Sequence, residues 1–483
     1  MAFARVLRSS ALMGGASALV LVAAFFRIKA IALMVGPEGV GLAGTFVNFN
    51  AIWAMAAGWG LATVGVRTVA SSNPSERAER IAAVRWLGIR LSWIGLLAMG
   101  LFFWPVGLWT FQDGERHILE LGLSGLAVPL LVSAGMWGGL LQAGGHLRVL
   151  ATTQVLSAFA GLVLGLPIIY VCHRAGYSFF GIALGILVAT ASPALLSWWA
   201  AREHCPTQRG TAVNPTFVRE LLHLGGPLMI AGLLGLLSQY VARWVVLGEF
   251  GLEGAGYYQA ALAIASVLPG FVFAAMATDF FPRVAAAKDE AEAHQMVEKQ
   301  ILASLLLALP ILAGLLTMGH VSIHLLYSST RFDPAVPLLT WMTWGVFFQV
   351  ISWPMGFWQQ ARGSTRVVLA VQCLAQALLA LLPLLLTSSF GLLGTAIAFA
   401  FGHLALLVMM LLTIRSMAKT WLSLQVWGYC VASALVLGLA QWGTAAVGGG
   451  YWGLVPTGLL TMTCAVIYYR TMRHEAQSAV TKS

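Results

Sequence analysis

Charged residues are scarce in this chain, and acidic residues are the scarcest. Only 9% of its 483 residues are charged, with 17 Asp and Glu against 27 Lys and Arg, whereas 59% are hydrophobic. Soluble domains carry about 25% charged residues, so this deficit excludes a soluble fold of such length. The basic residues are scattered between apolar runs and form no stripe. The formal net charge of +10 therefore does not indicate nucleic-acid binding.

Cysteine is also rare, and its spacing excludes two kinds of site. Four cysteines fall in or at the ends of apolar runs and Cys205 lies in a basic segment, which is not the spacing of a disulfide framework or a thiolate metal site. No metal-ligand cluster, nucleophile elbow, phosphate-cradling glycine loop or nucleotide motif stands out. The sequence therefore predicts no catalytic residue, no metal and no cofactor.

Long apolar runs, by contrast, cover most of the chain. Runs near the ~20 residues that cross a hydrocarbon core lie at 9–34, 41–69, 86–111, 118–141, 150–172, 178–200, 224–248, 256–281, 300–318, 337–360, 367–388, 391–414, 424–446 and 452–469. They predict an all-α polytopic membrane protein with about fourteen transmembrane helices. If the N-terminus is cytoplasmic, the outer loops carry only Arg116, Arg174 and Arg331. The other counted Lys and Arg lie in inner segments, as the positive-inside rule requires, so both termini are predicted to be cytoplasmic.

Three sequence motifs occur twice, at nearly the same spacing. The segment VGPEGVGLAG, with Gly36 and Gly41, matches FGLEGAGYYQ, with Gly251 and Gly256, 215 residues later. A Gln-Ala-x-Gly-x-x-Arg motif ending at Arg148 matches one ending at Arg366, and FGIAL from Phe180 matches LGTAI from Leu393. Such repetition indicates a duplicated unit. Since a shift of six helices preserves orientation, we predict two pseudo-symmetric six-helix lobes related as parallel repeats.

This duplication predicts the domain organisation. Residues 1–206 would form the N-terminal six-helix lobe and 207–420 the C-terminal six-helix lobe. Residues 421–483 would add two transmembrane helices and a cytoplasmic tail. Glycine suits the repeated turns because it tolerates positive φ, so the motifs can also be turns and nothing more.

Basic residues inside or near the ends of apolar runs are the candidate substrate-binding residues. A charge near the centre of a bilayer costs several kcal/mol, so such residues usually face a protein interior or a wet cavity. The candidates are Arg27, Lys29, Arg67, Arg90 and Arg243, with Asp279 the clear acidic companion. An excess of embedded positive charge predicts an anionic substrate, and a phosphate or pyrophosphate suits Arg and Lys.

Position separates these candidates. Arg67 and Arg90 lie within about two turns of the predicted cytoplasmic ends and can snorkel to the interface. Arg27 and Lys29 are two residues apart, about 200° around a helix, so they cannot both face one cavity. We favour Lys29 with Arg243, while interhelical hydrogen bonds to backbone carbonyls remain the structural alternative. The sequence leaves open which of Arg27 and Lys29 faces the cavity.

Aromatic residues give a second hint about the substrate. Six tryptophans lie on the second and tenth predicted helices: Trp53, Trp59, Trp341, Trp344, Trp353 and Trp358. Sugar rings stack on such side chains, but Trp is also common at membrane interfaces. Both interpretations stay open.

The segments RIKAIALMVGPEGVGLAG and ARWVVLGEFGLEGAGYYQ resemble those of lipid-linked oligosaccharide flippases, which serve O-antigen and enterobacterial common antigen synthesis. These belong to the multidrug/oligosaccharidyl-lipid/polysaccharide exporter superfamily. The resemblance implies a V-shaped pair of six-helix lobes around a central cationic cavity. By position, the family's basic residue in the first helix falls on Lys29, and the one in the seventh falls on Arg243. The two extra C-terminal helices depart from the usual twelve-helix pattern.

The function implied by this resemblance is flipping of an undecaprenyl-pyrophosphate-linked oligosaccharide across the bacterial inner membrane, from the cytoplasmic to the periplasmic leaflet. The expected partners are this lipid-linked glycan, membrane lipid and the polysaccharide polymerase machinery. A cation-coupled multidrug exporter of the same superfamily is one alternative, disfavoured by the shortage of embedded carboxylates. A membrane glycan polymerase or ligase is another, and it would need catalytic groups in an outer loop. The longest such segment, 319–336, holds His320, His324, Arg331 and Asp333.

Overall fold

The computed structural model describes residues 2–73, 75–111, 117–205, 213–275, 280–363 and 365–446, with Val455, Gly458, Leu459 and Thr463 beyond them. These residues are helical, with short turns and no strand among them. The chain divides into two compact units, Met1–Gly256 and Tyr257–Ser483. Asp279, the acidic residue noted in the sequence, lies outside the described residues.

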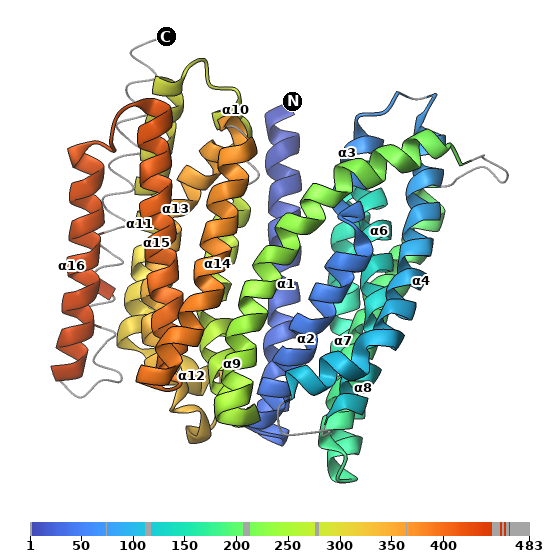
Figure 1. Cartoon of the computed structure of the whole chain (residues 1–483), viewed down its shortest axis with the longest axis horizontal. Coiled ribbons are helices and arrows are strands. Elements are labelled where there is room, and N and C mark those ends of the chain that lie inside the picture. The colour runs from blue at the N-terminus through green and yellow to red at the C-terminus, as the bar shows by residue number, and fades with distance from the viewer. Residues whose placement is uncertain are drawn as a thin grey trace. The chain divides into compact units, whose positions relative to one another are not determined.

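The first unit is built from eight helices and the first part of a ninth (Figure 1). These are α1 (Ala2–Met34), α2 (Pro37–Gly58), α3 (Leu61–Ala70), α4 (Arg77–Thr110), α5 (Ile118–Gly125), α6 (Ala127–Ala143), α7 (Leu147–Arg174), α8 (Ser178–His204) and α9 (Pro215–Ala275). Helix α6 packs against α4 and α8, and α7 packs against α8 and α1. Leu61, Val84 and Met136 belong to its buried core.

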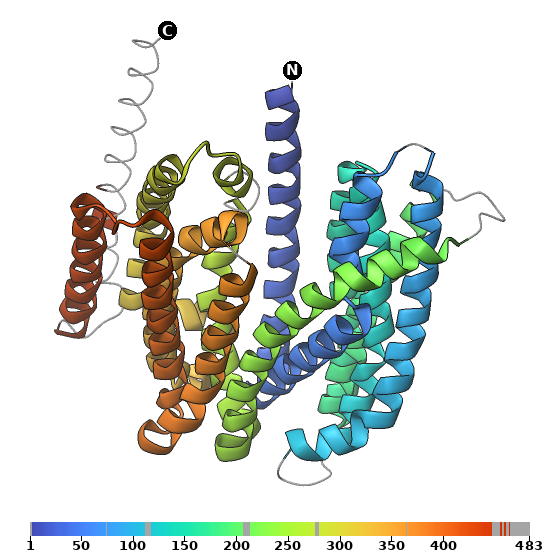
Figure 2. The ribbon, with the colours of Figure 1, turned by 45° about the horizontal axis from the view of Figure 1, so that its top comes forward.

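The second unit contains the end of α9 and the helices that follow it. These are α10 (Phe281–Ala285), α11 (Glu290–Thr317), α12 (Gly319–Tyr327), the 3-10 turn Thr330–Phe332, α13 (Ala335–Arg362), α14 (Thr365–Phe390), α15 (Leu393–Ala418) and α16 (Leu424–Ala446). Figures 1 and 2 both place α16, in red, at the edge of this unit, where it packs on α11.

Helix packing confirms the duplication. In the first unit α4 contacts α6, α6 contacts α8 and α7 contacts α8; in the second, α11 contacts α13, α13 contacts α15 and α14 contacts α15. The same order of contacts thus recurs along the chain. Two equivalent helices also carry an internal proline, Pro167 in α7 and Pro383 in α14. The boundary at 206/207 between the repeats stays a prediction.

The repeated glycine turns have matching backbone conformations. Gly36, before α2, has φ 84° and ψ −159°, and Gly251, which interrupts α9, has φ 64° and ψ −164°. Both lie in a region that residues with a Cβ rarely adopt, so glycine is required here. Proline at the first position of α2 then fixes a helical φ. The second motif differs, because Gly145 has φ 77° whereas Gly363 has φ −77°.

The two repeated turns also pack against each other, within the first unit. A Cβ on Gly41 would lie 2.3 Å from the carbonyl oxygen of Leu252, and a Cβ on Gly256 would lie 2.1 Å from that of Pro37. Pro37 and Leu252 are themselves equivalent positions of the two repeats. The contact is therefore reciprocal, and it depends on the absence of a side chain at both glycines.

Twelve helical segments among the described residues are long and apolar enough to span a bilayer, with α5 and α6 counted together as the segment Ile118–Ala143. One of them, Pro215–Ser266, contains the break at Gly251 and covers two predicted spans. Two other predicted spans are broken, at Trp59 and Gly60 between α2 and α3, and at Leu126 between α5 and α6. The predicted helix at 452–469 lies almost wholly outside the described residues, so the count of fourteen stays a prediction.

Candidate substrate-binding site

Arg243 is the most buried of the five candidate cations. It lies on α9 and is only 3% exposed. A guanidinium keeps its charge under all physiological conditions, and burying that charge in a membrane-spanning helix is costly. This burial distinguishes Arg243 from cations that reach the interface along a helix surface.

Aromatic side chains from α4 and α9 surround the same part of α9. The rings of Trp109 and Trp244 stack with centroids 5.1 Å apart, and Trp109 also stacks on Tyr240 at 5.9 Å. The Tyr240 hydroxyl hydrogen-bonds to the hydroxyl of Thr110, and the indole of Trp244 donates to the carbonyl oxygen of Trp109 over 2.7 Å. Tyr240 lies one helical turn from Arg243, on the same face of α9. The end of α4 thereby holds the segment of α9 that carries the buried guanidinium.

Lys29 and Arg27 lie on α1 and are both half-buried. The ammonium of Lys29 lies 5.6 Å from the ring centroid of Phe25, one turn earlier, which is within the range of a cation–π contact. The side chain of Phe26, which directly precedes Arg27 in the sequence, is 52% exposed. Burial alone does not decide which of the two cations faces a cavity.

Arg67 and Arg90 are exposed. Arg67 occupies the last turn of α3, where a positive charge is favoured by the helix dipole. The guanidinium of Arg90 lies 3.8 Å from the ring centroid of Trp86 on its own helix, α4. Burial therefore sets these two residues apart from Arg243, and their snorkelling to the interface stays a prediction.

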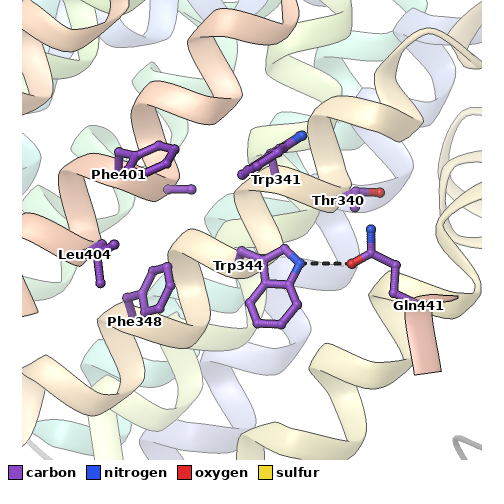
Figure 3. A pocket seen from close by; sticks show the side chains of 8 residues that line it. Thr340, Trp341, Trp344, Phe348, Phe401, Leu404 and Gln441 are labelled. Carbon is purple, nitrogen blue, oxygen red and sulfur yellow. Dashed lines mark hydrogen bonds between the residues drawn. The ribbon is translucent and has the colours of Figure 1, made fainter. Parts of the chain in front are cut away.

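A cavity of about 400 Å³ opens in the second unit between α13, α15 and α16 (Figure 3). Its lining is almost entirely aromatic and aliphatic: Thr340, Trp341, Trp344, Phe348, Ala400, Phe401, Leu404 and Gln441. The rings of Trp341 and Phe401 stack with centroids 6.4 Å apart. The indole of Trp344 donates to the side-chain oxygen of Gln441 over 3.0 Å (Figure 3). Such a lining suits an apolar chain or the face of a sugar ring.

The tryptophans noted in the sequence differ in whether they line this cavity. Trp341 and Trp344 line it, whereas Trp358 is fully buried and donates to a carboxylate oxygen of Glu290 over 2.9 Å. Trp59 donates to the carbonyl oxygen of Leu222 over 2.9 Å, at the break between α2 and α3. The last two are therefore structural. Sequence reasoning missed Phe401 and Gln441, since only the packing of α15 and α16 brings them to α13.

Comparisons with known proteins agree with this architecture. The family described as "Polysaccharide biosynthesis protein" matches residues 6–288, more than half of the chain. The chain belongs to this family. The resemblance to oligosaccharide flippases noted at the two glycine turns is thereby confirmed. A curated relative from Shigella flexneri, "Putative O-antigen transporter", is 24% identical over 374 residues, covering 76% of this chain and 87% of the relative.

Solved transporter structures share the fold of this chain. The structure titled "Lipid II flippase MurJ, inward closed conformation" aligns with a TM-score of 0.70 at 13% identity, over 95% of this chain and 99% of the other. An inward-facing multidrug resistance MATE family transporter of the MOP superfamily aligns with a TM-score of 0.67 at 16% identity, over 82% and 95%. The chain is a multi-pass membrane protein with this transporter fold.

Proposed function

We propose that this protein is a flippase that moves an undecaprenyl-pyrophosphate-linked oligosaccharide from the cytoplasmic to the periplasmic leaflet of the bacterial inner membrane. The glycan would serve surface polysaccharide synthesis, as an O-antigen or enterobacterial common antigen unit. The observation that carries this proposal is the buried guanidinium of Arg243 on a membrane-spanning helix. A family of polysaccharide biosynthesis proteins supplies the substrate class.

In this proposal Arg243 and Lys29 contact the pyrophosphate. The guanidinium fork can bond two oxygens at once, and an ammonium acts as a point charge. Arg27, Arg67 and Arg90 are secondary candidates that the substrate meets on entering or leaving. No bond is broken, so the protein acts as a transporter and not as an enzyme.

The aromatic cavity of the second unit is proposed by itself as a contact for an apolar chain or a sugar ring. Trp341 and Trp344 offer ring faces, and Gln441 is the polar side chain opposite Trp344. The cavity walls are uncharged, so it would not hold the pyrophosphate.

The membrane potential supports the proposed direction. Each elementary charge that crosses the field gains or loses about 2.3 kcal/mol per 100 mV. With a negative interior, an anionic headgroup moves outward favourably, and emptied basic side chains return inward favourably. Coupling to a cation gradient, as in the multidrug-exporter alternative, would need embedded carboxylates, and the predicted spans carry few.

The test is leaflet-resolved measurement of lipid-linked glycan in cells whose copy of this protein is replaced by a variant. A hydrogen bond to a charged group contributes about 1.5–3 kcal/mol, so Lys29→Ala and Arg243→Ala should each cut transport by roughly tenfold or more. Glycan should then accumulate on the cytoplasmic side. Arg219→Ala is the matched control, because Arg219 is an exposed arginine in the first turns of the same helix, α9.

Two results would contradict the proposal. Full transport by the Lys29→Ala/Arg243→Ala double variant, at normal protein level, would remove both residues from the substrate site. Accumulation of unpolymerised glycan on the periplasmic side in cells lacking the protein would instead support a polymerase or ligase.

A further inference from the structure

Three side chains with metal-binding atoms meet between α11 and α13 of the second unit. His320 and His324 lie on α12, and Asp333 directly follows the 3-10 turn. Nε2 of His324 lies 2.8 Å from Oδ1 of Asp333, and Nδ1 of His320 lies 3.9 Å from the same oxygen. One donor atom from each residue lies within 4.8 Å of the other two. We propose that His320, His324 and Asp333 bind a divalent transition-metal ion, best matched by Zn²⁺.

The donor set favours this class of metal. Two imidazoles and one carboxylate make a three-ligand zinc set that leaves a fourth position for water, whereas Ca²⁺ and Mg²⁺ prefer oxygen ligands throughout. Histidines four residues apart on a helix lie on the same face. At zinc bond lengths of about 2.0–2.2 Å, tetrahedral ligand atoms lie about 3.3–3.6 Å apart. The distances from Oδ1 of Asp333 to His324 and His320, 2.8 and 3.9 Å, fall on either side of that range, so small side-chain rotations complete the geometry.

The backbone that carries Asp333 is held firmly relative to α12. Tyr327, the last residue of α12, and Phe332, the last residue of the 3-10 turn, are fully buried and stack with centroids 4.3 Å apart. The Tyr327 hydroxyl donates to the carbonyl oxygen of Ala260, and the amide of Asp333 donates to the carbonyl oxygen of Thr330 over 3.0 Å. A site whose ligands stand on such a fixed backbone needs little reorganisation to bind.

A purely structural role for the cluster would depend mainly on His324. Its 2.8 Å contact with Asp333 can hold the turn without any ion. His320 separates the two explanations, because it is 60% exposed and too far from Asp333 for a hydrogen bond, yet its Nδ1 faces the same oxygen. Within the part of the chain that the structure describes, this is the one such grouping of three or more His, Cys, Asp or Glu side chains.

The direct test is calorimetric titration of ZnCl₂ into the full-length protein, purified without a histidine tag in detergent. One saturable site per chain is expected. His320→Ala should lower the affinity at least tenfold without changing the apparent Tm of the metal-free protein. His223→Ala is the matched control, since His223 is an exposed histidine on α9 of the other unit, and it should bind as the parent does.

A second measurement reports the ligands themselves. Co²⁺ in place of Zn²⁺ should give the visible absorption bands of a tetrahedral site with the parent protein, and His320→Ala should lose them. Excess Zn²⁺ should raise the apparent Tm of the parent and not of His320→Ala. Absence of saturable Zn²⁺ binding, or unchanged affinity in His320→Ala, would overturn the proposal. Neither readout depends on transport, so this site can fail while the proposed function stands.

Discussion

A methyl group added at Gly256 should destabilise the first unit by pushing two repeated turns apart. Its Cβ would lie 2.1 Å from the carbonyl oxygen and 2.5 Å from the carbonyl carbon of Pro37. Optimal separations of nonbonded carbon atoms begin at about 3.5 Å, so α2 and α9 must separate locally by roughly 1 Å. The obstacle is backbone, which cannot rotate away as a side chain can.

The size of the effect follows from two opposing contributions. Overpacking of a well-packed site costs about 1–3 kcal/mol, and a backbone obstacle places Gly256→Ala at the upper end. Alanine regains up to about 1 kcal/mol in a helix interior relative to glycine. The net loss of about 2 kcal/mol should lower the apparent Tm by about 4–8 °C for a unit of this size. Thermal unfolding of the purified protein in detergent measures it.

Gly235→Ala is the matched control on the same helix, because a Cβ there meets no atom within 4 Å. It should leave the apparent Tm unchanged or raise it slightly. The reciprocal contact adds a sharper test with Gly41→Ala. Either methyl group forces the separation that accommodates the other, so the double variant should lose less than the sum of the two single losses. Equal apparent Tm values for Gly256→Ala and Gly235→Ala would refute the close contact, and strict additivity would refute its reciprocity.

Two further predictions concern contacts near the ends of the membrane spans. Glu290→Ala should cost about 1–3 kcal/mol, because it leaves the buried indole of Trp358 without an acceptor; Glu290→Gln keeps an acceptor and should lose less in the same thermal assay. Cys205 should react with maleimide far more slowly in the folded protein than after denaturation. Burial raises the pKa of the Cys205 thiol, so its reactive thiolate forms only at a higher pH than usual. A labelling rate at pH 7.5 equal to that of the denatured protein would contradict this prediction.

The sequence predicted those features that single residues encode. Positive φ at Gly36 and Gly251 was predictable because glycine alone adopts it at low cost. At Gly363 the same reasoning gave the wrong conformation, since φ is negative there and a Cβ would instead lie 2.4 Å from the carbonyl oxygen of Gln359. Hydropathy also missed the breaks at Gly60 and Leu126, because an apolar run has the same composition whether the helix is straight or bent.

Features that need tertiary packing could not be predicted. Phe401 and Gln441 reach the aromatic cavity from helices far apart in sequence, and no periodicity records which helices pack together. His320 and Asp333 were visible as residues of one outer segment, but the buried Tyr327 fixes the turn that brings them together. In both cases the sequence supplied the side chains and the packing supplied the site.

The two repeats share the glycine turns at Gly36 and Gly251 but carry their basic residues at different positions. The 215-residue offset pairs Gly36 with Gly251, but it pairs Lys29 with Trp244 and Arg243 with Ile28. Contacts that depend on glycine are structural and must be satisfied in both repeats, so they persist at equivalent positions. A substrate with one charged end gains nothing from a second copy of each cation, so binding residues are free to differ between the repeats. This divergence at otherwise equivalent positions is compatible with the proposed transport of a substrate charged at one end, and it supports the proposal that Lys29 and Arg243 contact the substrate while the paired glycines form the scaffold.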